Sequence, residues 1–260
     1  MCRKSDPVGV FDSGIGGISA LREMKRILPN ETFIYYGDIF HAPYGTKTTE
    51  EVVACVNNVV HGLILQKIKA LVIACNTATG AAAETLRRNL DIPVIGMEPA
   101  LKPASEIRGE GMILVLATPL TLQQEKFTRL MEKYGKGAVK VPCVGLMEMV
   151  ENEDWERAGQ FLEGVFSGFD MNQVDAIVLG CTHYVFLKEL IRSMVPDRIA
   201  ITEGSEGTAR QLKRVLQRGN LMNEQGPGRV ILQTSGTEKD ICLMKKLLEG
   251  DPVRFSPRKQ

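Results

Sequence analysis

Two short segments of the 260-residue chain are versions of one another. Residues 70–77 and 176–183 each consist of an apolar run that ends in a cysteine followed by small polar residues. Continuous apolar runs of this length are typical of strands covered on both faces, as in parallel sheets. The sequence therefore predicts that Cys75 and Cys181 lie where two buried strands end.

The spacing of a second pair of residues supports a duplication. Cys75 and Cys181 are 106 positions apart, and so are Asp12 and Thr118, which also follow apolar runs. One offset that relates two strand ends indicates two related halves, each presenting one thiol. Two thiols in equivalent settings suit a reaction carried out on two sides of one substrate.

Strand-like runs alternate with helix-length segments along the whole chain. This alternation predicts an α/β fold with mainly parallel sheets. The expected strands cover residues 8–11, 32–36, 70–74, 93–96, 112–117, 138–141, 176–179, 198–202 and 229–234.

The offset also predicts how the chain is divided. We expect two pseudo-symmetric domains, the first from residues 1–97 plus 206–260 and the second from 98–205, with 98–111 as the crossover. Ligands of open parallel sheets bind outside the carboxyl ends of the strands. We therefore expect the active site in the cleft between the domains, with Cys75 and Cys181 on opposite sides of one ligand.

Charge and hydropathy favour a small-molecule partner. The formal charge is +1 and no strong basic bias is present, so no footprint for nucleic acid or an anionic membrane is expected. No apolar run approaches the roughly 20 residues that span a bilayer, and the first residues lack the apolar stretch of a signal peptide. We expect a cytoplasmic protein.

The remaining cysteines and histidines give no pattern of metal ligands. No two cysteines form a CxxC pair, and disulfides are not expected in a reducing compartment. With only three histidines, we expect no metal site. The residues interpreted as surface or core positions are Cys2, Cys55, Cys143, Cys242, His41 and His61.

Residues 12–17 combine a strand end, a glycine loop and a helix start. The pattern Gly14-x-Gly16-x-x-Ser19 approximates a dinucleotide-binding loop, with Asp38 at a suitable distance for a ribose. However, the third glycine is replaced, and Asp12 would face the pyrophosphate. Amides at a helix start can instead hold a substrate carboxylate, while Asp12 accepts from an ammonium group. We favour the amino-acid site; a nucleotide-binding or non-enzymatic module, or a simple turn, is the alternative.

Each cysteine of the repeat has a local source of activation. A free thiol has a pKa of about 8.5 and is mostly protonated at neutral pH. A helix predicted to begin after Cys75 would lower its pKa, and His183 can pair with Cys181 or pass it a proton. Residues 41–46 form a turn-rich loop that either folds over a pocket through Tyr44 or is an ordinary surface turn. Nothing local decides the role of Glu151.

Four motifs together carry a family resemblance. Residues 10–17, 43–45, 74–78 and 179–184 resemble glutamate racemases of the aspartate/glutamate racemase family, over about residues 8 to 215. The resemblance implies a cofactor-independent enzyme that inverts the α-carbon of glutamate and supplies D-glutamate for bacterial peptidoglycan. A thiolate on one face removes the α-proton, and a thiol on the other face returns one.

The resemblance also implies roles for single residues. Cys75 would be the base toward D-glutamate and Cys181 the base toward L-glutamate. Asp12 and His183 would tune the thiols and contact the amino group, with Glu151 as an auxiliary catalytic candidate. The substrate carboxylates and ammonium would be held by Asp12, Ser13, Tyr44, Gly45, Asn76, Thr77, Thr118, Thr182 and His183.

Some features depart from the family pattern or leave alternatives open. After Thr121, the segment Gln124-Glu-Lys-Phe127 stands where the family commonly has a serine and a tyrosine, so the resemblance does not define that wall of the pocket. The first residues do not resemble the N-terminal extension of members activated by a cell-wall precursor, so we do not expect regulation of that type. Homodimers are common in the family, and we expect one here. A racemase for aspartate or another acid is the alternative function.

Overall fold

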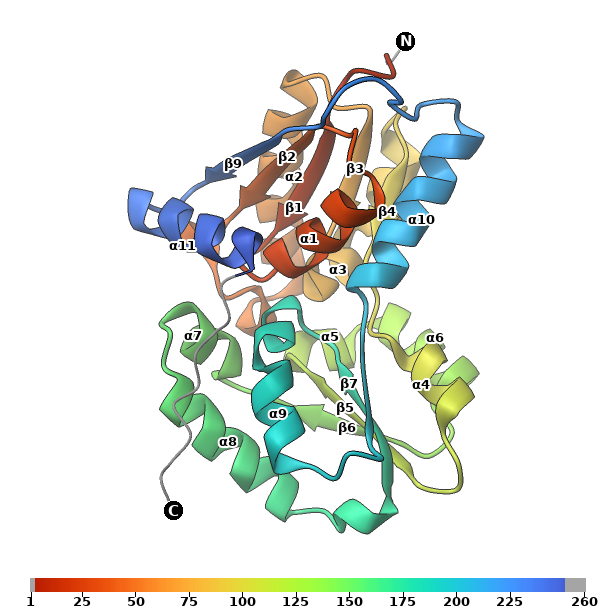
Figure 1. Ribbon diagram of the computed structural model, residues 1–260, viewed down its shortest axis with the longest axis vertical. Coiled ribbons are helices and arrows are strands. Elements are labelled where there is room, and N and C mark those ends of the chain that lie inside the picture. Colours follow the sequence, from red (N-terminus) through yellow and green to blue (C-terminus); the bar gives the residue numbers. More distant parts are fainter. Residues whose placement is uncertain (1–2, 251–260) are drawn as a thin grey trace.

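Two parallel β-sheets, each covered by helices on both faces, make up the fold of this computed structural model, which describes residues 3–250 (Figure 1). Every strand pairing within the two sheets is parallel. The predicted fold class is therefore confirmed. Within residues 3–250, no helix combines the length and apolar character that crossing a membrane requires.

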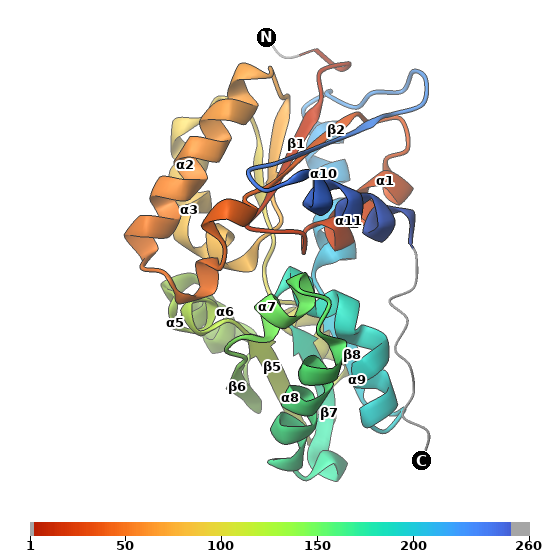
Figure 2. The same ribbon diagram turned by 90° about the vertical axis from the view of Figure 1, so that its left-hand side faces the viewer.

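The first sheet has the strand order β4-β3-β1-β2-β9. Its strands are β1 (Val8–Asp12), β2 (Phe33–Gly37), β3 (Ala70–Ile73), β4 (Val94–Gly96) and β9 (Val230–Thr234). Helices on both sides bury β1 and β3 completely, which explains their continuous apolar sequences. One face carries α2 (Thr49–Leu65) and α3 (Asn76–Asn89), and the other α1 (Ile18–Ile27), α10 (Ser205–Arg218) and α11 (Glu238–Glu249) (Figure 2).

The second sheet has the order β6-β5-β7-β8. Its strands are β5 (Met112–Ala117), β6 (Ala138–Pro142), β7 (Val174–Leu179) and β8 (Ala200–Glu203). One face packs against α4 (Leu101–Ile107), α5 (Pro119–Gln123) and α6 (Glu125–Tyr134), and the other against α7 (Leu146–Glu151), α8 (Trp155–Ser167) and α9 (Lys188–Met194). Short 3₁₀ helices are η1 (Ile39–His41), η2 (Tyr44–Thr46), η3 (Met171–Gln173) and η4 (Thr182–Leu187).

The strand orders of the two sheets show the duplication that the spacing predicted. If β1 to β4 are matched in turn with β5 to β8, both sheets have the same order, and β9 is an addition to the first. In this match Cys75 and Cys181 follow equivalent strands, and so do Asp12, which ends β1, and Thr118, which follows β5. The two halves therefore present corresponding strand ends to one another.

The chain passes between the sheets twice, near residues 97–100 and 203–205. A Cβ atom on Gly204 would lie 2.8 Å from Cγ of Met97 and 2.9 Å from the carbonyl oxygen of Glu98, so the two passages touch. The expected crossover at 98–111 is helical over half of its length, because Leu101 and Ala104 are buried as α4 packs on the second sheet. After the second passage α10 packs on α1, and β9 pairs with β2.

Candidate active site

Cys75 is the N-cap residue of α3 and is separated from the end of β3 by Ala74. Its Sγ accepts hydrogen bonds from the Ser13 hydroxyl at 3.4 Å and from the backbone N–H of Ala78, also at 3.4 Å. Burial and the nearby Asp12 carboxylate raise the pKa of Cys75 to about 12, although these two hydrogen bonds act to lower it. The helix start that the sequence predicted is present, but burial outweighs its effect on the thiol.

Cys181 follows β7 at the start of η4 and is paired differently. Its Sγ lies 3.6 Å from Nδ1 of His183, and Nε2 of this imidazole lies 2.9 Å from Oε1 of Glu151. Burial alone would lower the pKa of His183. Its hydrogen bonds to Cys181 and Glu151, together with the charges of both groups, instead raise this pKa well above the usual range. The thiol, the imidazole and the carboxylate thus form a hydrogen-bonded series through which a proton can be transferred.

Glu151 links the two halves of the molecule. It ends α7 on the second sheet, yet its Oε1 also accepts from the backbone N–H of Ile15, in the glycine loop of the first sheet, at 3.3 Å. A Cβ atom on Gly14 would overlap this oxygen, and one on Gly16 would lie 2.5 Å from Nδ1 of His183. The glycines therefore allow side chains of the other half to approach. These side chains fill the space that a pyrophosphate would need.

Asp12 is fully buried at the carboxyl end of β1. Its carboxylate accepts from the backbone N–H of Gly14 at 3.0 Å and from the Thr182 hydroxyl, across the cleft, at 3.1 Å. Burial raises the pKa of Asp12 to about 6, against the lowering effects of His183 and of the two hydrogen bonds. Asp12 is thus a fully buried group that is largely ionised at neutral pH.

A small cavity lies between the two thiols and collects most of the predicted site residues. Asp12 and Glu151 do not line the cavity, but they are hydrogen-bonded to Thr182 and His183, which do. Met147 and Gly180 line it and were not predicted; their only signal is proximity in sequence to Glu151 and Cys181. The lining residues are Ser13, Tyr44, Gly45, Cys75, Asn76, Thr77, Thr118, Met147, Gly180, Cys181, Thr182 and His183.

Thr77 and Thr118, one from each half, line one wall of the cavity, and their hydroxyl groups meet that of Thr121 behind it. Thr77 Oγ1 lies 3.0 Å from Thr118 Oγ1 and 2.9 Å from Thr121 Oγ1, and Thr118 donates to Thr121 at 2.9 Å. Gln124 donates from Nε2 to the carbonyl of Thr77 at 2.9 Å. Thr121 and Gln124, from the segment that departs from the family pattern, therefore hold Thr77 and Thr118 in place by hydrogen bonds.

Asn76 has an unsatisfied acceptor beside the cavity. The residue is 6% exposed, and its Oδ1 is buried without a hydrogen-bond partner among the described residues. Leaving such an atom unpaired costs about 1–3 kcal/mol. A ligand with an N–H group in the cavity would remove this cost.

The other cysteines and histidines lie outside the cavity. Cys143 is buried, Cys242 is exposed and Cys55 is half-buried, while Cys2 lies outside the described residues. His61 is exposed on α2. The interpretation of these positions as surface or core therefore agrees with the structure for the described residues, except that His41 contacts a buried carboxylate.

A larger cavity lies elsewhere, at the two passages of the chain between the sheets. It is lined by Glu98, Thr202 and Gly204 among others, and by neither thiol of the repeat nor His183. The chemistry of the lining residues, not the size of the cavity, therefore locates the candidate active site.

The fold and the site define an α/β protein of two related parallel sheets, with one cysteine thiol from each half facing a small polar cavity in the cleft. The chain belongs to the Asp/Glu/Hydantoin racemase family, whose model matches residues 9–212. The resemblance seen in the four motifs is therefore confirmed.

Individual relatives and solved structures agree with this placement. A glutamate racemase of Clostridium botulinum is 44% identical over 257 residues, which cover 96% of this chain and 100% of the relative. The structure of glutamate racemase from Thermus thermophilus in complex with beta-chloro-D-alanine matches with a TM-score of 0.81 at 31% identity, over 97% of this chain and 96% of the other. A glutamate racemase of Bacillus anthracis matches with a TM-score of 0.84 at 30% identity, over 95% of both chains.

Proposed function

We propose that this protein is a glutamate racemase that interconverts L- and D-glutamate without a cofactor and supplies D-glutamate for peptidoglycan biosynthesis. The observation that carries the proposal is the pair of thiols, Cys75 and Cys181, on equivalent strand ends at two sides of one small cavity. The similarity to glutamate racemases over nearly the whole chain supports glutamate as the substrate.

The two thiols act as base and acid on opposite faces of the α-carbon. Cys75 as a thiolate removes the α-proton of D-glutamate, and Cys181 as a thiol returns a proton to the other face. The reverse reaction begins with Cys181 as the base. The amides at the start of α3 and the wall of threonine hydroxyls stabilise the negative charge that develops on the substrate carboxylate.

Binding of the substrate helps to form the thiolate. The free protein holds Cys75 as a thiol, because its pKa is about 12. A substrate ammonium beside Asp12 would be a positive charge close to Cys75, and it would favour the charged forms of both groups. The free acceptor on Asn76 supports the same placement of an N–H group. On the other side, Cys181 can give its proton to His183, which Glu151 holds in place.

Three finer features belong to the same proposal. We assign residues 1–97 and 206–260 to one domain and 98–205 to the other, supported by the strands that each sheet contains. We place the enzyme in the cytoplasm, as expected from the sequence. We expect a homodimer, as in many members of the family.

Exchange of the α-hydrogen in D₂O tests the reaction. Both enantiomers of glutamate should exchange this hydrogen for deuterium, and Cys75→Ser and Cys181→Ser should each lower racemisation by about 10²–10⁴-fold, the range of general acid–base catalysis. Cys242→Ser, at an exposed thiol, is the matched control and should retain full activity. Undiminished racemisation in either of the first two variants would exclude the two-base assignment.

A panel of amino acids tests the substrate. Glutamate should be racemised with the highest kcat/KM among glutamate, aspartate and their amides. If aspartate were the better substrate, the reaction would stand and the substrate assignment would be wrong.

A further inference from the structure

A buried carboxylate outside the cavity has few positive partners. Asp38 follows β2, is 1% exposed, and accepts from the Tyr44 hydroxyl at 2.6 Å and the Ser235 hydroxyl at 2.8 Å. Among residues 3–250, the one group within ion-pair distance of it is His41, whose Nδ1 lies 2.9 Å from Oδ1, and this ring is charged only when it is protonated. Buried carboxylates are rarely left without a cation.

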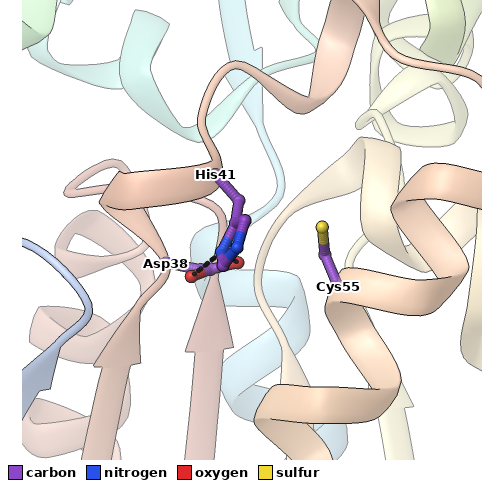
Figure 3. A group of neighbouring side chains, drawn as sticks. All are labelled: Asp38, His41 and Cys55. Atoms are coloured by element: carbon purple, nitrogen blue, oxygen red, sulfur yellow. Dashed lines mark hydrogen bonds and ion pairs between the residues drawn. The ribbon is translucent and has the colours of Figure 1, made fainter.

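Cys55 places a third ligand-type group beside this pair. It lies on α2, so the three residues come from a strand end, a 3₁₀ turn and a helix (Figure 3). One ligand atom from each of Asp38, His41 and Cys55 lies within 4.8 Å of the other two. Cys55 is half-buried and the His41 side chain is 44% exposed, so the cluster is open to solvent on one side.

The geometry points to a binding site for a thiophilic divalent cation of the zinc class, formed by Asp38, His41 and Cys55. Thiolate, imidazole and carboxylate are the ligand set of zinc, and three protein ligands with a water in the fourth position form an open tetrahedral site. Ligands of such a site lie about 3.5 Å apart, given metal–ligand bonds of about 2.0–2.3 Å. Rotation of the partly exposed His41 and Cys55 side chains closes the difference of about 1 Å.

Binding is balanced by release of a proton. The Cys55 thiol gives its proton to solvent as the sulfur–metal bond forms, and the histidine binds through a neutral nitrogen. Asp38 contributes its existing negative charge. No sequence motif indicates this site, because the spacing between His41 and Cys55 matches no metal-binding pattern. The packing of α2 against the first sheet brings the three residues together.

The cation site is connected to the candidate active site through Tyr44. This residue lines the cavity, as does its neighbour Gly45, and its hydroxyl donates to the same carboxylate that would bind the cation. A cation on Asp38 competes with that hydroxyl for the carboxylate oxygens. Occupancy therefore loosens the Tyr44 wall and weakens substrate binding, a consequence that rests on the proposed racemase function.

Cobalt(II) is the probe for the site itself, because a cobalt–thiolate bond gives a charge-transfer band that zinc removes by competition. The full-length protein, kept reduced, should bind one Co²⁺ with this band, and Cys55→Ser and His41→Ala should each lose it. The matched controls Cys242→Ser and His61→Ala, both at exposed positions, should keep it. Absence of the band in the wild-type protein, or its survival in both Cys55→Ser and His41→Ala, would overturn the site.

Racemisation kinetics test the connection to Tyr44 separately. One equivalent of Zn²⁺ should raise the KM for glutamate at least threefold in the wild-type protein and leave that of Cys55→Ser unchanged. Equal effects on both proteins would place the inhibitory zinc elsewhere, such as on the thiols of the cavity, and would overturn the connection. The cobalt measurement needs no racemase activity, so failure of the proposed function and failure of the site can be told apart.

Discussion

The carboxylate of Glu151 lies 2.9 Å from Nε2 of the His183 imidazole, whose other nitrogen faces the Cys181 thiol. Cys75 has no equivalent imidazole and is bonded to a hydroxyl and a backbone amide instead. The two thiols thus have the same proposed role but different hydrogen-bond partners. Because the two enantiomers have equal free energies, kcat/KM must be the same in both directions in every variant. A difference between the two proton-transfer steps can therefore be seen only in isotope effects.

Replacing Glu151 should slow the step in which Cys181 is the base. Glu151→Gln removes the negative charge that helps to keep His183 protonated. A decrease of one unit in the pKa of His183 lowers its protonation about tenfold, so we expect kcat to fall about tenfold. The primary deuterium isotope effect on kcat/KM should increase for L-[α-²H]glutamate and decrease for D-[α-²H]glutamate. Glu153→Gln, at an exposed position, is the control. Equal changes for both enantiomers would contradict a role specific to Cys181.

Replacing Ser13 should have the opposite signature. Its hydroxyl donates to Cys75 and lowers the pKa of this thiol, so Ser13→Ala should make the Cys75 thiolate harder to form. We expect the isotope effect to increase for D-[α-²H]glutamate and decrease for the L enantiomer. Ser193→Ala, at an exposed serine, should change neither value. A larger effect with the L enantiomer would reverse the assignment of the two bases.

Asp12 should lower the stability of the folded protein at neutral pH. Its folded-state pKa, about 6, exceeds the ordinary value of 3.8 because of burial, so the folded protein binds this proton more tightly than the unfolded chain. The resulting stabilisation is complete below about pH 4 and is lost as the pH rises through 6. Asp12→Asn should therefore unfold with a free energy about 1–3 kcal/mol higher than wild type at pH 8.

Denaturant titrations of Asp12→Asn at several pH values check this window. The difference from wild type should shrink toward zero as the pH approaches 4, and racemisation should be lost at every pH. A variant less stable than wild type at pH 8 would show that the charge of Asp12 stabilises the fold.

Alanine substitutions at two glycines, Gly45 and Gly62, distinguish a steric effect on the cleft from an effect on the stability of the fold. A Cβ atom on Gly45 would lie 2.6 Å from Cβ of Thr118 on the other half, whereas one on Gly62 in α2 meets nothing within 4 Å. Gly45→Ala should lower kcat/KM at least tenfold by holding the halves apart. Gly62→Ala should leave activity unchanged and raise the free energy of unfolding by about 0.5–1 kcal/mol. Full activity of Gly45→Ala would show that the cavity walls need not approach this closely.

The strands and the positions of the two cysteines were predictable because both depend on local pattern. Buried parallel strands must be continuously apolar, and a polar residue after such a strand lies at the sheet edge where ligands bind. The repeat offset then paired Cys75 with Cys181 without any knowledge of their distance.

Features that depend on contact between the two halves were not predictable in the same way. Glu151 has no local signal, and its role depends on how α7 meets the glycine loop and η4. The pKa of Cys75 was expected to be lowered by a helix start, but the desolvation that outweighs this effect arises only when the cleft is enclosed. Likewise, Asp38 and Cys55 meet only because α2 packs against the first sheet.

The pairing of β9 with β2 has a consequence for synthesis on the ribosome. The second sheet, from β5 to β8, comes from one continuous stretch of chain and is complete while the tail is still being made. The edge of β2 remains uncovered until Val230–Thr234 has emerged, and an open strand edge readily pairs with other chains. A nascent or truncated chain that lacks β9 should therefore be prone to aggregation, although both thiols of the cavity have already been made.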